Sequence, residues 1–143
     1  MTQLYDTINR KINNMQMSRQ QLKELFVTAV VYLTIDIFYI RSNSEYFGVF
    51  FKQVQGKPMV IRKSAAIMAY LLLVAGLYFF IIKDRKNVVY AFLLGLFVYG
   101  VYDLTNYATF SNWTLEFVIK DTLWGGAVFA VSTFFIYEVI KRI

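Results

Sequence analysis

The chain has 143 residues, a formal net charge of +6 and a hydrophobic fraction of 58%. Water-soluble domains are at most about half apolar, so this composition favours a membrane protein, and the length indicates a single domain. The absence of cysteine and histidine excludes disulfides, Cys/His zinc sites and every catalytic triad built on either residue.

The first 21 residues are polar and carry apolar side chains at helical spacing. This periodicity predicts an amphipathic helix that lies on the membrane surface, with a flexible tail as the alternative. The segment does not read as a signal peptide, because its apolar core comes too late and no small-residue cleavage site follows it. The apolar positions are Leu4, Ile8, Ile12 and Met15.

Four apolar segments are long enough to cross a bilayer, which takes roughly 20 helical residues. They cover about residues 22–40, 64–82, 88–109 and 115–140. Residues 41–62 mix aromatic and polar side chains and then reach a glycine and a proline, which predicts an interfacial helix followed by a turn. The fold class is therefore all-α: an integral membrane four-helix bundle, residues 22–143, preceded by the amphipathic segment, residues 1–21.

The basic residues flank the apolar segments, where they contact anionic lipid headgroups, and no nucleic-acid-binding motif is present. The lipid bilayer is the partner that follows, and nucleic acid is not expected. Four spans place both termini on one side, and that side carries the larger share of Lys and Arg, which predicts cytoplasmic termini. The two sets are Arg10, Lys11, Arg19, Lys23, Lys83, Arg85, Lys86, Lys141 and Arg142 against Arg41, Lys52, Lys57, Arg62, Lys63 and Lys120.

Three carboxylates lie inside the predicted spans: Asp36, Asp103 and Asp121. A charged group within a span costs about 2.5–3.5 kcal/mol on insertion scales, so it indicates a functional site. At about 1.5 Å per residue, these three residues and Tyr70 reach a similar layer in the outer half of a ~30 Å core. Four helices thus each contribute one polar group to one level.

Other polar groups accompany the carboxylates. Tyr99, Asp103 and Asn106 are spaced i, i+4, i+7 on one helical face, and Asp121 shares a face with Trp124. No Lys or Arg lies at this depth, so the carboxylates need a bound proton, a metal cation or a basic ligand. The predicted ligand or proton site comprises Asp36, Tyr70, Tyr99, Asp103, Asn106, Thr109, Asp121 and Trp124.

The sequence predicts no catalytic residue and no cofactor, and a metal is the least supported occupant because no metal-loop spacing is present. Two other interpretations stay open. The polar groups can act as interhelical hydrogen bonds in a membrane scaffold or assembly protein. A single carboxylate can also serve as general base in an intramembrane lipid enzyme. Four short helices enclose little volume, so a transporter is expected to form a homo-oligomer.

The second half of the chain resembles a known family. Residues 102–109 read YDLTNYAT, Trp113 follows, and residues 121–125 read DTLWG. This is similar to the pattern Y-D-x-T-N-x-A-T, a Trp four residues on, and D-x-x-W-G of the small membrane proteins called domain of unknown function 2177. Thr114 stands where that family often has Pro, and the N-terminal amphipathic stretch is an addition.

The resemblance covers roughly residues 22–140, because Asp36 also falls where that family carries an aspartate. It implies a four-helix membrane protein, and it carries no specific activity over to this chain. It further implies that a set of polar residues in the spans acts together. These are Asp36, Asp103, Asn106, Asp121 and Trp124.

Overall fold

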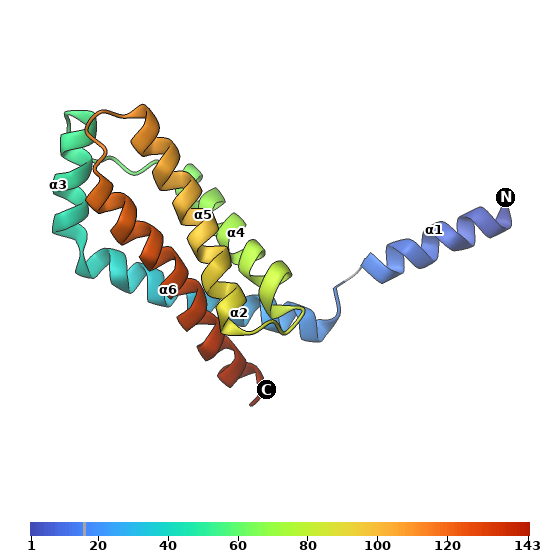
Figure 1. Ribbon diagram of the computed structural model, residues 1–143. Helices are drawn as coiled ribbons and strands as arrows, with labels where there is room; N and C mark the ends of the chain where they lie inside the picture. The colour runs from blue at the N-terminus through green and yellow to red at the C-terminus, as the bar shows by residue number, and fades with distance from the viewer. Residues whose placement is uncertain (16) are drawn as a thin grey trace.

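The computed structural model describes residues 1–15 and 17–143, leaving aside the side chains of residues 10–15, and every regular element in that part is a helix (Figure 1). Four helical stretches are long and apolar enough to cross a membrane, and each coincides with a predicted span. The predicted all-α, four-span fold is therefore confirmed. The elements are α1 (Thr2–Met15), α2 (Arg19–Ser42), α3 (Ser44–Gln55), α4 (Lys63–Leu77) continued by the π-helical turn η1 (Tyr78–Ile82), α5 (Val88–Thr109) and α6 (Leu115–Ile140).

Local signals in the sequence set the ends of the spans. Ser18 and Gln21 form a reciprocal capping box at the start of α2. Asn87 caps α5 by accepting from two backbone N–H groups, and Thr114 caps α6 through one. Gly56 ends α3 in the left-handed conformation, at the turn predicted from Gly and Pro.

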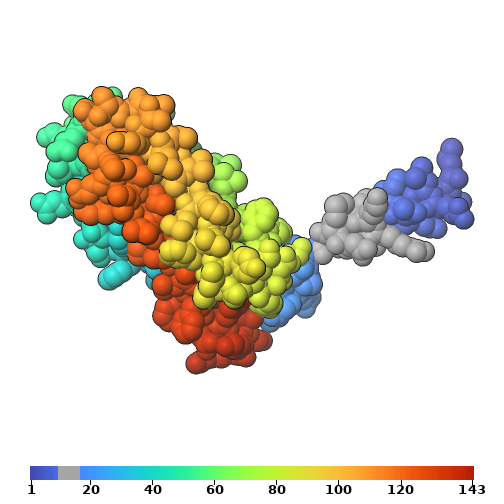
Figure 2. Space-filling model, viewed as in Figure 1, coloured from blue at the N-terminus to red at the C-terminus, as the bar shows by residue number. Residues whose placement is uncertain are grey.

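The N-terminal segment forms the predicted helix, and α1 lies apart from the bundle (Figures 1 and 2). Leu4, Tyr5 and Ile8 are exposed apolar side chains one turn apart, as on a helix that rests on lipid. Its position on the membrane surface stays a prediction. The side chains of Ile12 and Met15 lie outside the described residues.

Helices α5 and α6 share the most extensive helix–helix contact in the described chain, and glycines permit it. A Cβ on Gly95 would strike the carbonyl oxygen of Gly125, and one on Gly125 would strike the ring of Tyr99. Small residues allow the backbones of transmembrane helices to approach closely. This pair of helices therefore forms the most tightly packed part of the bundle.

The main contacts connect the helices in the order α4, α2, α6, α5, so α2 and α6 are central. The helix α3 packs across the α5–α6 turn, where Phe50 stacks on Phe117 with ring centroids 3.8 Å apart. Trp113 is 5% exposed within this aromatic cluster, because α3 covers it. We call this end of the bundle the α3 end, and the end with Arg19, Arg85 and Lys141 the terminal end.

The glycine contact gives a matched test. Gly95→Ala should lower the free energy of unfolding by about 1–3 kcal/mol, because the added methyl group meets backbone that cannot move aside. Gly76→Ala, in α4, is the control, because its Cβ would meet nothing within 4 Å. Denaturant titration of both purified variants in detergent measures the difference. Equal stabilities would show that the α5–α6 contact leaves room for a methyl group at Gly95.

Candidate functional site

The structure places the four predicted polar groups at one level. Asp36, Tyr70, Asp103 and Asp121 each lie about six or seven residues from the α3 end of their helix, which is about 9 to 10 Å along it. The site is thus built from all four spans.

Hydrogen bonds to Asp36 connect three helices, α2, α4 and α6. Its carboxylate, 3% exposed, accepts a hydrogen bond from the Tyr70 hydroxyl at 2.8 Å and another from Trp124 Nε1 at 3.0 Å. The Trp124 indole stacks on Tyr39, with ring centroids 3.7 Å apart. Packing therefore fixes the orientation of the indole that donates to Asp36. Trp124 is accordingly half-buried against a carboxylate.

Asp103 is the most deeply buried carboxylate in the described chain. It is fully inaccessible, and its Oδ2 accepts a long hydrogen bond from Thr122 at 3.3 Å. Its Oδ1 has no hydrogen-bond partner among the described residues. Asp121, partly buried on α6, adjoins Thr122 in the chain and lies close enough to Asp103 for the two carboxyl groups to interact. Two carboxyl groups are therefore neighbours where α5 meets α6.

The predicted site residues do not all converge. The Tyr99 hydroxyl meets the Tyr32 hydroxyl at 2.9 Å, beside the Asp36 cluster. Asn106 and Thr109, however, donate to backbone carbonyls of their own helix, at Tyr102 and Thr105. The structure thus groups Asp36 with Tyr70 and Trp124, pairs the other two aspartates, and leaves Asn106 and Thr109 outside.

The polar face of α2 extends well beyond Asp36, and this extension was not predicted from the sequence. Its buried residues are Glu24, Thr28, Tyr32 and Asp36, so the interior face of this transmembrane helix is polar along most of its length. The signal was present in the sequence, because these residues recur every fourth position on one helical face. Of these four residues, only Asp36 lies deep enough in its span for the sequence alone to indicate a buried polar site.

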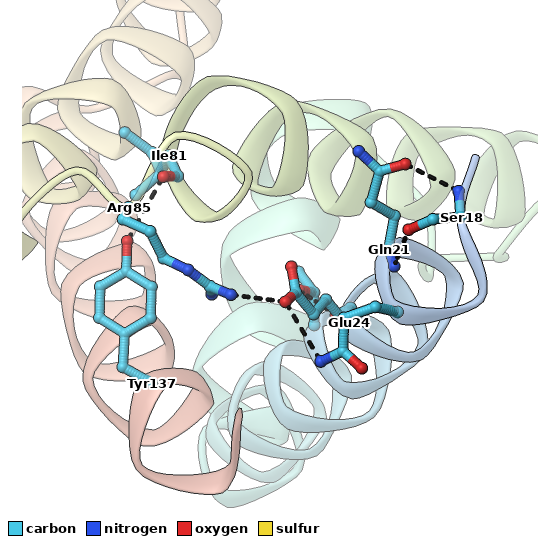
Figure 3. Close-up of polar contacts among 8 residues, drawn as sticks. Ser18, Gln21, Glu24, Ile81, Arg85 and Tyr137 are labelled. Atoms are coloured by element: carbon cyan, nitrogen blue, oxygen red, sulfur yellow. Dashed lines mark hydrogen bonds and ion pairs between the residues drawn. The ribbon is translucent and has the colours of Figure 1, made fainter. Parts of the chain in front are cut away.

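Glu24 marks the terminal end of this face. It is 5% exposed and forms an ion pair with Arg85, whose backbone adopts a left-handed φ of 53° in the turn before α5 (Figure 3). The guanidinium lies 6.0 Å from the ring centroid of Tyr137, and the Tyr137 hydroxyl donates to the Lys86 carbonyl at 2.5 Å. These contacts connect α2, the α4–α5 turn and α6.

We call the level of Asp36, Tyr70, Asp103 and Asp121 the acidic layer. Its carboxyl groups have no basic partner among the described side chains, and this decides the chemistry available there. Among the residues whose side chains the structure describes, 1–9 and 17–143, no ion pair includes Asp36, Asp103 or Asp121. Within the same residues, no group of three or more His, Cys, Asp or Glu is placed to hold a metal ion. The arrangement can take up a proton or one small positive group.

The comparisons agree with this membrane architecture. The family model described as "Predicted membrane protein (DUF2177)" matches residues 21–137. The matched range contains nearly all of the four spans and every residue of the acidic layer. No curated protein and no solved structure matches the chain.

The donors to Asp36 can be tested separately. Tyr70→Phe and Trp124→Phe should each lower stability by about 1–3 kcal/mol, because each leaves a buried carboxylate oxygen without its hydrogen bond. Tyr107→Phe is the control, because Tyr107 is exposed on α5. Thermal unfolding in detergent measures all three. If Tyr70→Phe and Trp124→Phe unfold like the control, these donors do not hold Asp36.

Proposed function

The chain belongs to the DUF2177 family of predicted membrane proteins, and we propose that it binds a proton at a buried pair of aspartates, Asp103 and Asp121. It is an integral, multi-pass membrane protein with four candidate spans. The observation that carries the proposal is the unpartnered Oδ1 of the fully buried Asp103, which lies beside a second carboxyl group.

The electrostatics of the pair favour one bound proton. Two carboxylates side by side in a low-dielectric interior repel each other strongly, and a shared proton removes one charge and makes a hydrogen bond between them. The nearest basic side chain in sequence, Lys120, pairs with Glu116 and lies over the ring of Tyr46. It therefore does not neutralise the aspartates, and the proton is the smallest cation that can.

Asp36 extends the site without completing a metal centre. Its two donors, Tyr70 and Trp124, are neutral, so they orient the carboxylate without cancelling its charge. A hard divalent cation takes six or more oxygen ligands, which this layer does not gather. A protonated amine or a monovalent cation is the next candidate occupant.

The proton is directly observable. Infrared spectra of wild-type protein in detergent at neutral pH should contain the carbonyl band of a protonated carboxyl group, and Asp103→Asn should remove it. Asp121→Asn should shift the band, because Asp103 loses its neighbouring carboxyl group but stays fully buried, and burial by itself disfavours the charged form. Asp84→Asn, in the exposed α4–α5 turn, is the control and should keep the band.

Two results would count against this function. A wild-type spectrum without the band, or an Asp103→Asn spectrum that keeps it, would mean that the pair holds no proton. If the variants also keep full stability, the polar layer serves helix association, and the scaffold interpretation becomes the better one.

We also propose that the terminal end faces the cytoplasm, because most Lys and Arg residues lie there. The chain has no cysteine, so single cysteines report topology cleanly. In intact cells, a membrane-impermeant maleimide should label Ser111→Cys, at the α3 end, and should label Asp84→Cys only after permeabilisation. The reverse pattern would invert the topology.

A further inference from the structure

The interior polar row of α2 reaches from the acidic layer to the terminal end. Glu24, Thr28, Tyr32 and Asp36 are buried and spaced four residues apart, which places one polar group about every 6 Å over about 18 Å. Polar side chains inside a membrane bundle are costly, and they mark ion or proton pathways. The question is whether neighbouring helices continue the row at each level.

At the level of Tyr32, α5 contributes a second hydroxyl group to the row. The Tyr32 and Tyr99 hydroxyls are 2.9 Å apart, and either can donate to the other. The edge of Phe129 packs against the Tyr32 ring, with centroids 5.5 Å apart, which sets α6 beside α2 at this height. This level lies one turn from Asp36, and so directly below the acidic layer.

One turn closer to the terminal end, the row continues across α6. Because α2 and α6 run antiparallel, the step from Tyr32 to Thr28 corresponds to the step from Phe129 to Ser132 and Thr133. All three hydroxyl residues are fully buried. Thr28 and Thr133 donate to the carbonyls one turn before them, and their oxygens can still accept.

The last level is the ion pair of Glu24 and Arg85. The fully buried Tyr78 begins the π-helical turn that ends the second span, just before Arg85 in the chain. The Arg85 side chain is about half exposed, so this level reaches the aqueous side of the bundle. π-Helical turns within α-helices occur frequently at functional sites.

Two buried hydroxyls along the row have no partner among the described residues. They are Ser132 Oγ and Tyr78 Oη, and both residues are fully buried. Buried polar atoms are nearly always hydrogen-bonded, and a bound water is the usual partner where protein groups are absent. These atoms sit at the two levels that lack a direct interhelical hydroxyl contact, where a water is needed to continue the row.

We propose that this row conducts protons between the aspartate pair and Glu24, an inference that rests on the proposed function. Each hydroxyl or water accepts a proton on its oxygen and releases another from the same oxygen, so no bond to carbon changes. The walls of the row are apolar and closely packed, as at Leu77, Val128 and Ile136, all fully buried. Hydrated ions larger than a proton therefore cannot pass.

The test is proton flux into liposomes. The full-length protein is reconstituted with an internal pH-sensitive dye, and an acid pulse is applied with the membrane potential clamped. Wild type should acidify the lumen faster than empty liposomes. Thr28→Val and Ser132→Ala should reduce the rate to that of empty liposomes, because each removes a buried hydroxyl with little change in volume.

Thr34→Val is the matched control. Thr34 and Thr28 both lie on α2 and both donate to the carbonyl four residues earlier, but Thr34 is exposed toward lipid. This variant should conduct like wild type, and Thr28→Ser, which restores the hydroxyl, should recover the flux. If Thr28→Val does not fold, Ser132→Ala carries the same comparison.

The outcomes separate the two proposals. If the infrared band of the aspartate pair is present but wild type conducts no protons, or Thr28→Val conducts as well as wild type, the proton row is wrong and the binding site stands. Potassium flux at a similar rate would also overturn the row. If the band itself is absent, the proposed function fails, and the row no longer ends at a proton-binding site.

Discussion

The constraint on which this structure depends is the absence of hydrogen-bond partners in lipid. A polar side chain within the hydrocarbon core must find its partner inside the protein. α2 carries four such side chains on one face, from Glu24 to Asp36, so that face must point into the bundle. The helix consequently occupies a central position, and its opposite face presents Phe26, Val30 and Phe38 to lipid.

The second determinant is the glycine contact between α5 and α6. Close approach at Gly95 and Gly125 lets the backbones meet, and the same register brings Asp103 against Thr122 and its neighbour Asp121. The tightest packing in the described chain therefore also brings two carboxyl groups together. Strongly packed helices can hold two like-charged groups together, which a loosely packed bundle would separate. Conflicts of this kind are common at functional sites.

The two ends of the bundle differ in chemistry. At the α3 end, an aromatic cluster around Phe50, Trp113 and Phe117 packs α3 against the start of α6. At the terminal end, the buried Glu24 meets the half-exposed Arg85, so charge and solvent are close together. In the proposed row, protons reach the acidic layer past Glu24 and Arg85 at the terminal end and past the partly exposed Asp121 at the α3 end.

The sequence by itself determined the membrane class, the four spans and the shared depth of Asp36, Tyr70, Asp103 and Asp121, because apolar length and helical rise fix how far along a span each residue lies. Only the tertiary structure decided which of them meet, because contact also depends on how each helix is rotated and crossed. Asn106 has the right spacing yet bonds to its own helix, since a short amide can reach the carbonyl one turn earlier. Glu24 lies at the edge of its span, where a charge ordinarily faces water, and it is buried only because the turn after the second span brings Arg85 to it.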